Sequence, residues 1–184
     1  INNSGNITNT SSDAESAGIR NADSGTITTI TNTGTIAGTN VDIRNADTFG
    51  NTGTITTLNN SQGGSDALTY SYALPTNYNV IVNSTSDFGK TVFSSVSGTT
   101  TFGVHSTSTL AGDTTYSSVL SGLSSGDIAS GTSGSYVSGS LRKDWTLSNS
   151  SGTLWDLVVA ADQDITPDSN TTVQNVKDDV ILGF

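Results

Sequence analysis

A five-residue phrase recurs four times in the first third of the chain. Its shared form is Asn or Asp, then Ser or Thr, then Gly, then a polar residue, then Ile, and its copies begin at Asn3, Asp23, Asn32 and Asn51. A pattern that returns this faithfully indicates stacked structural units. Stacked β-coils form long rigid stalks and display surfaces more often than compact catalytic pockets. The repeat therefore restricts both the fold and the function.

The spacing of apolar residues within the repeat predicts a bent chain. Ile27 and Ile30 lie three positions apart, so one straight strand would send them to opposite faces. A bend lets both point to one interior, and Gly and Asn supply the turn conformations. At about 20–30 residues per coil, we expect an all-β fold: a short right-handed parallel β-helix of two to three coils with a C-terminal β-rich, hairpin or sandwich-like cap. The expected repeat core is Ile7, Ile27, Ile30, Ile36, Ile55 and Leu58.

Three segments are expected along the chain. Residues 1–60 carry the repeats and are assigned to the β-helix coils, with stacked Asn side chains forming amide ladders. Residues 61–165 stay β-rich but lose the phrase, and every aromatic residue except Phe49 lies at or after Tyr70. Because an open solenoid edge invites aggregation, we interpret this segment as a cap. Residues 166–184 are expected to form a linker, either as an amphipathic helix or as a frayed tail.

Composition excludes several classes of function. The net charge is −10, with only six Lys and Arg, so no basic stripe exists for nucleic acid. There is no Cys, which excludes disulfides, thiolate catalysis and Cys-ligated metal. No apolar run is long enough for a membrane-spanning helix. Since the sequence begins at Ile1 without an initiator Met, we expect an excised fragment.

Short motifs in the chain match active-site patterns only by chance. Residues 122–126 fit G-x-S-x-G, but the single His105 precedes the serine, whereas a nucleophile elbow needs a later histidine. Asp162, Asp164 and Asp168 alternate without the Gly and Glu of a calcium loop, so a solvated acidic turn is the default. We therefore expect no catalytic, cofactor-binding or metal-binding residues and no cofactor.

Charged residues recur at equivalent positions of the repeat. Arg20 and Arg44 occupy one position, and Asp23 and Asp47 another. On successive coils they are expected to stack as an exposed row of Arg–Asp ion pairs. A contact with a carbohydrate or a receptor is the alternative reading of these positions.

The order of motifs resembles a known family. Repeats N-T-G-T-I and I-T-N-T-G-T-I, then Y-N-V-I-V, then G-T-L-W-D-L-V, resemble the C-terminal part of autotransporter passenger domains from Gram-negative bacteria. The resemblance implies a right-handed β-helix exported through an outer-membrane barrel, ending in an autochaperone unit that caps the helix and promotes folding. A Leu-Trp pair that matters in that unit maps to Leu154 and Trp155, with Tyr78 and Ile81 in the same core.

The resemblance implies a non-catalytic passenger fragment at the cell surface, whose full-length protein is an adhesin. Its implied partners are its own outer-membrane translocator barrel and a glycan or protein on a host or neighbouring cell. Two rivals stay open: a polysaccharide-acting β-helix enzyme, with paired carboxylates in a cleft, and a repeat adhesin outside the autotransporter class.

Overall fold

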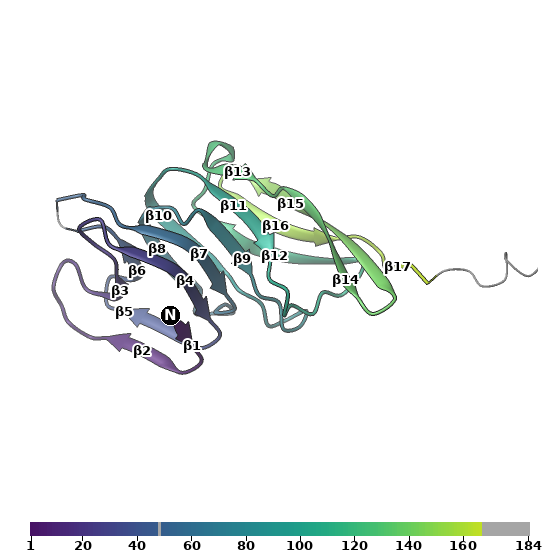
Figure 1. The fold of residues 1–184 in the computed structure, drawn as a ribbon, viewed down its shortest axis with the longest axis horizontal. Coiled ribbons are helices and arrows are strands. Elements are labelled where there is room, and N and C mark those ends of the chain that lie inside the picture. Colours follow the sequence, from purple (N-terminus) through teal and green to yellow (C-terminus); the bar gives the residue numbers. More distant parts are fainter. Residues whose placement is uncertain (48, 167–184) are drawn as a thin grey trace, which may run out of the picture.

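The computed structural model describes residues 1–47 and 49–166 of the chain. Strands make up 59% of the structure, and the chain winds as a parallel β-solenoid of about five turns. The coils follow one another along the long axis of the molecule (Figure 1). This confirms the expected all-β parallel β-helix. The helix or tail expected for residues 166–184 lies outside the described residues from 167 onward.

Two parallel ladders form the walls of the solenoid. Thr and Ile favour extended backbone, and Gly and Asn end the strands at the corners. The six-stranded sheet contains β1 (Asn2–Asn3), β4 (Thr26–Asn32), β7 (Thr54–Asn60), β9 (Asn77–Val80), β11 (Thr100–Val104) and β13 (Ile128–Ser130). The parallel part of the nine-stranded sheet contains β3 (Ala17–Arg20), β6 (Val41–Asn45), β8 (Leu68–Ala73), β10 (Thr91–Ser97) and β12 (Thr114–Ser121).

The third wall is shorter and ends at a side-chain amide. It consists of β2 (Asn6–Asn9) and β5 (Thr35–Gly38), paired in parallel. Where the next coil would add a strand, the buried Gln62 side chain accepts a hydrogen bond from Ile36 N at 2.8 Å and donates one to Ile36 O at 3.2 Å. The Gln62 amide thus replaces a peptide group and satisfies the strand edge.

Apolar side chains stack in register from coil to coil. In the six-stranded sheet Ile30 pairs with Leu58, Leu58 with Tyr78, and Tyr78 with Phe102. The nine-stranded sheet carries a second column of Ile19, Ile43, Tyr70 and Phe93. Both columns change from aliphatic to aromatic toward the C-terminus, so the interior is filled by larger side chains there.

Most of the expected repeat core is buried. Four of its members are at most 1% exposed, namely Ile30, Ile36, Ile55 and Leu58. Ile7 and Ile27 are only partly buried and pack against the core from its edge. Ile27 has a neighbouring strand on one side only, because the short β1 pairs with Thr31 and Asn32 and stops before reaching it.

The predicted amide ladders run through the solenoid corners. Asn3 Nδ2 donates to Asn32 Oδ1 at 2.9 Å, and Asn32 Nδ2 donates to Asn60 Oδ1 at 3.1 Å. A second ladder joins Asn21 Nδ2 to Asn45 Oδ1 at 2.9 Å. In both ladders the amide of the earlier coil donates to the amide of the later coil, so the ladders have a fixed direction.

Antiparallel strands end the parallel ladder. Strand β12 pairs in parallel with β10 on one side and antiparallel with β16 on the other, and the short 3₁₀ turn η1 (Ser125–Asp127) follows it in the chain. The remaining cap strands are β14 (Ser133–Ser138), β15 (Leu141–Ser151), β16 (Leu154–Val159) and β17 (Gln163–Asp164). In Figure 1 the β14–β15 hairpin extends away from the coils at the C-terminal end.

Two tryptophans of these hairpins close the interior. Trp145 meets the ring of Phe102 edge-on at 5.6 Å, so it covers the last member of one column. Trp155 pairs with Leu120 across the strands, and its indole Nε1 donates to Leu123 O at 2.8 Å. Gly134 lies opposite Trp145, and a Cβ atom there would stand 2.5 Å from the indole ring.

The solenoid is longer than expected. Strands β8 to β13 continue the parallel pairing beyond residue 60, so the expected two to three coils are too few. Residues 61–165 therefore contain both further coils and the cap. The physical reason is that Tyr70 takes the position after Ile43 and Tyr78 the position after Leu58, which ends the phrase but keeps the register.

Candidate functional site

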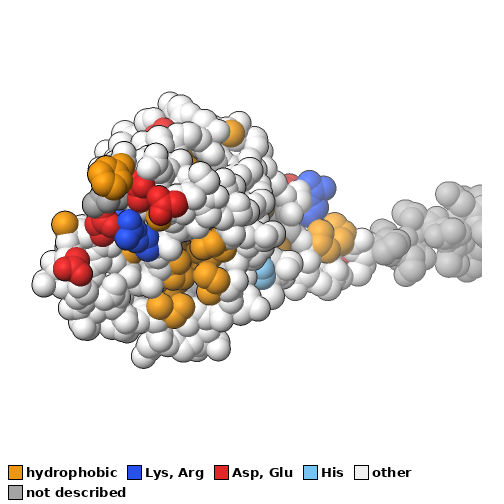
Figure 2. Space-filling model, turned by 60° about the vertical axis from the view of Figure 1, so that its left-hand side comes forward, with side chains coloured by type: hydrophobic (Ala, Val, Ile, Leu, Met, Phe, Trp, Pro, Cys, Tyr) orange, Lys and Arg blue, Asp and Glu red, His pale blue; other side chains and the backbone are white. Residues whose placement is uncertain are grey.

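The N-terminal coils carry a cluster of charged side chains on their outer surface. Figure 2 shows acidic and basic side chains gathered on this side of the molecule, on a surface where most atoms belong to the backbone or to side chains that are neither charged nor hydrophobic. Arg20 on β3 and Arg44 on β6 are in register, as their repeat positions predict. The two arginines nevertheless have different partners, and this difference defines the site.

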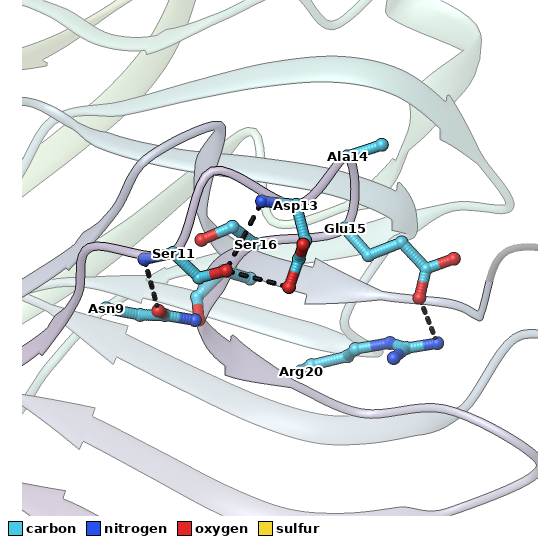
Figure 3. A pocket seen from close by; sticks show the side chains of 8 residues that line it. Asn9, Ser11, Asp13, Ala14, Glu15, Ser16 and Arg20 are labelled. Atoms are coloured by element: carbon cyan, nitrogen blue, oxygen red, sulfur yellow. Dashed lines mark hydrogen bonds and ion pairs between the residues drawn. The ribbon is translucent and has the colours of Figure 1, made fainter.

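Arg20 is neutralised by a nearby carboxylate. Its guanidinium lies 2.5 Å from Glu15 Oε2, and this pair forms one side of a hollow of about 420 Å³ (Figure 3). On the other side, the Ser11 hydroxyl donates to Asp13 Oδ2 at 2.8 Å, and Asn9 Oδ1 accepts from Ser11 N. The hollow is thus acidic, and its one cation is already paired.

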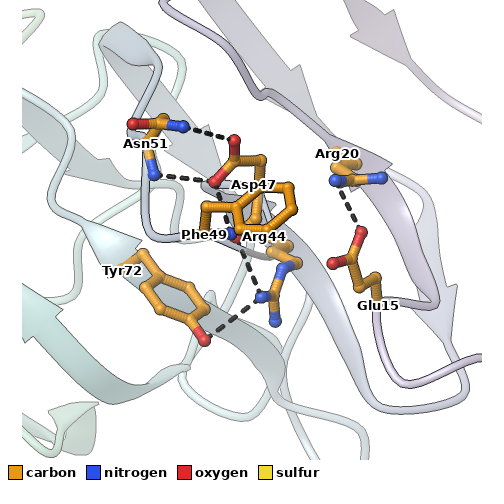
Figure 4. A network of polar contacts seen from close by, with 7 residues as sticks. All are labelled: Glu15, Arg20, Arg44, Asp47, Phe49, Asn51 and Tyr72. Carbon is orange, nitrogen blue, oxygen red and sulfur yellow. Dashed lines mark hydrogen bonds and ion pairs between the residues drawn. The ribbon is translucent and has the colours of Figure 1, made fainter.

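Arg44 lies between an aromatic ring and a carbonyl group. Its guanidinium is 4.4 Å from the centre of the Tyr72 ring, and its Nη2 donates to Tyr72 OH at 3.1 Å and to Asp47 O at 3.2 Å (Figure 4). Within the described ranges no carboxylate lies within ion-pair distance of Arg44. The expected row of Arg–Asp ion pairs is therefore wrong: Arg20 pairs with Glu15, and Arg44 contacts the backbone carbonyl of Asp47 rather than its carboxylate.

The Asp47 carboxylate instead folds the loop that follows it. It accepts hydrogen bonds from Phe49 N at 2.8 Å, Asn51 N at 2.7 Å and Asn51 Nδ2 at 2.7 Å. Desolvation opposes ionisation of the carboxyl group, but the hydrogen bonds with Asn51, Asp23 and Phe49 together lower the pKa of Asp47. The pKa of Asp23 is raised, chiefly by a hydrogen bond with Asp47 and secondly by desolvation. The loop presents Phe49 to solvent, 89% exposed.

The residues of the short sequence motifs make separate local contacts. Ser124 Oγ donates to Asp127 at 2.8 Å, while His105 contacts Thr107. Asp162 forms an ion pair with Lys143, and Asp164 Oδ1 accepts a hydrogen bond from Thr166 Oγ1. Asp168 lies outside the described residues. In the part of the chain that is described, no group of three or more His, Cys, Asp or Glu is placed to hold a metal ion.

The residues assigned to the cap core differ in burial. Trp155, Tyr78 and Ile81 are buried, and Tyr78 OH lies 2.8 Å from Thr91 Oγ1. Burial raises the pKa of Tyr78 to about 12. Placing Leu154 in the core is wrong, because it is 37% exposed. Alternate residues of a strand face opposite sides, so the inward direction of Trp155 sends Leu154 outward.

Sequence reasoning missed two further residues with structural roles. Trp145 had no repeat or motif around it, and its place over Phe102 depends on the fold of the β14–β15 hairpin. Gln62 comes two residues after Asn60, the last Asn of its ladder, and this position was the one signal in the sequence that it hydrogen-bonds a strand edge.

Comparison with protein-family models, with curated proteins and with solved structures gave no match. Over residues 1–47 and 49–166, no helix has the length and apolarity that crossing a bilayer requires.

Proposed function

We propose that this chain is the capped, membrane-proximal end of an exported β-solenoid of the autotransporter passenger type. Its direct role is to terminate the solenoid and to promote its folding at the cell surface after passage through its own outer-membrane barrel. The full-length protein is an adhesin in this proposal, and the fragment has no catalytic role.

The observation that carries the proposal is the way the interior ends. Two in-register columns change from isoleucine to aromatic side chains; one finishes at Phe102 against Trp145, and Trp155, which also belongs to the antiparallel strands, is buried beside Leu120 and donates to Leu123 O. A solenoid needs terminal units that protect its edges, and this arrangement supplies one at the C-terminal end. The order of repeat, cap and tail is also the order that the sequence resemblance implies.

The direction of the amide ladders supports growth from this capped end. In the Asn3–Asn32–Asn60 and Asn21–Asn45 ladders Asn Nδ2 donates toward the C-terminal neighbour, so in these ladders an already folded coil offers amide oxygens to the coil that precedes it. An incoming coil therefore finds a strand edge, an apolar column and oriented hydrogen-bond acceptors. Adding a coil to such an edge avoids a new nucleation step. Folding outside the membrane would then oppose back-sliding and favour export without ATP.

Pulsed hydrogen exchange during refolding from urea tests the order of folding. We expect backbone amides of β12, β15 and β16 to become protected before those of β1 to β6. The Trp155→Ala variant should delay protection of both groups, whereas Leu154→Ala, which removes an outward-facing side chain, should leave the order and rates nearly unchanged. Earlier protection of β1 to β6, with the cap amides still exchanging, would contradict the proposal.

A further inference from the structure

Arg44 lacks the counter-ion that its equivalent in the previous coil possesses. Arg20 pairs with Glu15, and the register between the coils makes Thr39 the counterpart of Glu15. The backbone contact between Asn40 N and Ser16 O supports this alignment, because these two residues follow directly after Thr39 and Glu15. The second coil thus repeats the guanidinium but replaces its carboxylate by a hydroxyl.

A hollow of about 190 Å³ lies beside this unpaired cation. Its lining includes Arg44, Ser71, Tyr72, Ser94 and Ser95, and no Asp or Glu is among its residues. Two other hollows on the described surface are lined by carboxylates, one by Asp13 and Glu15 and the other by Asp66 and Asp87. On a chain with a net charge of −10, the Arg44 hollow therefore differs in sign from its surroundings.

Two buried groups of the Arg44 hollow have no hydrogen-bond partner among residues 1–47 and 49–166. They are Arg44 Nε and Ser71 Oγ, and Ser71 is only 6% exposed. Arg44 and Ser71 are in register on β6 and β8, and Ser71 is in register with Ser94 on β10. Buried donors without partners are uncommon in folded proteins and destabilise them. The register of Arg44, Ser71 and Ser94 thus places a guanidinium N–H without a partner next to hydroxyl groups.

We propose that the Arg44 hollow binds the oxyanion of an acidic sugar, that is, a carboxylate or sulfate group carried on a sugar ring. Guanidinium and hydroxyl donors without a competing carboxylate select an oxyanion over a cation or a neutral group. The volume is several times the roughly 30 Å³ that one water occupies, so there is room for part of a ring. Hydroxyls on strands spaced about 4.8 Å apart can then meet the ring hydroxyls along the solenoid axis.

Nuclear magnetic resonance titration of the ¹⁵N-labelled chain tests the proposal. The probes are sodium glucuronate, sodium sulfate and neutral glucose, added at constant ionic strength held with sodium chloride. We expect saturable amide shifts confined to Ser71, Tyr72, Ser94 and Ser95 with glucuronate, a dissociation constant at least threefold weaker with sulfate, and no saturable shift with glucose. Equal affinity for sulfate and glucuronate would overturn the assignment to a sugar. Absence of saturable shifts with both anions would overturn the site itself.

Three variants separate binding in the Arg44 hollow from a general electrostatic effect. Arg44→Gln and Thr39→Glu, the second supplying the missing carboxylate, should each weaken glucuronate binding at least tenfold. Arg20→Gln removes the same charge from the neighbouring strand and should change the affinity less than twofold, because Arg20 is already paired. Heteronuclear spectra of the free variants verify that each is folded. An equal loss of affinity in Arg20→Gln and Arg44→Gln would refute the proposal.

Discussion

Replacing Trp155 by alanine should destabilise the whole solenoid. The side chain is 5% exposed, and its indole N–H donates to Leu123 O at 2.8 Å. Large-to-small replacement of a buried Trp costs about 3–5 kcal/mol, and the unpaired buried carbonyl adds about 1 kcal/mol. We therefore expect a loss of about 4–6 kcal/mol; with a urea m-value of about 2–3 kcal/mol/M, the midpoint should fall by about 2 M.

Urea unfolding followed by circular dichroism measures this loss, and two variants serve as controls. Leu154→Ala changes the adjacent residue on the exposed face and should cost less than about 1 kcal/mol. Trp155→Phe keeps an aromatic ring but removes the N–H donor, so its loss of stability should lie between the losses of Leu154→Ala and Trp155→Ala. The reasoning is refuted if Leu154→Ala lowers the midpoint as much as Trp155→Ala does.

Three further predictions concern the ladder and the titrating groups. Asn32→Ala removes the partner of three amide side chains in the interior and should cost about 2–4 kcal/mol in urea unfolding. Because burial raises the pKa of Tyr78 to about 12, above about 10 for unfolded tyrosine, its stabilising contribution is complete below about pH 10. That contribution should be lost between about pH 10 and pH 12. The urea midpoint of the unchanged protein should therefore fall over this range by more than the midpoint of Tyr78→Phe, which has no phenol group at this position to ionise. Hydrogen bonds from Ser135 and Arg142 lower the pKa of Asp144, so its contribution is present above about pH 4 and lost on acidification; a carbon-13 titration should show the lowered value, and Arg142→Gln should raise it.

The sequence was sufficient for the solenoid class because the repeat imposes one local solution. Two isoleucines three positions apart need a bend, and stacked Asn side chains need parallel register; Ile30, Leu58 and the Asn3–Asn32–Asn60 ladder follow from these two requirements. The length of the solenoid could not be predicted in the same way. Register in a parallel ladder is maintained by backbone hydrogen bonds, so Tyr78 can succeed Leu58 without any repeated phrase.

The polar site was less predictable, because it depends on side-chain reach rather than on periodicity. Repeat spacing correctly places Arg20 beside Arg44. It cannot tell that Glu15 reaches Arg20 from a loop, or that the Asp47 carboxylate turns toward the amides of its own loop. The substitution of Thr39 for Glu15 was visible in the sequence once the coils were aligned, and it is the one signal that could have distinguished the two arginines.

The two ends of the solenoid are chemically different, and this difference follows from the directed ladders. At the N-terminal end, the first amides in each ladder, Asn3 and Asn21, already use their Nδ2 groups toward later coils. What they can offer to an added strand is therefore the acceptor Oδ1. Two such ends placed face to face would bring acceptors against acceptors, which gives no hydrogen bond. A coil that contributes Asn donors in the same direction fits instead, so we expect this end to favour extension of the parallel stack over pairing with the same end of a second copy.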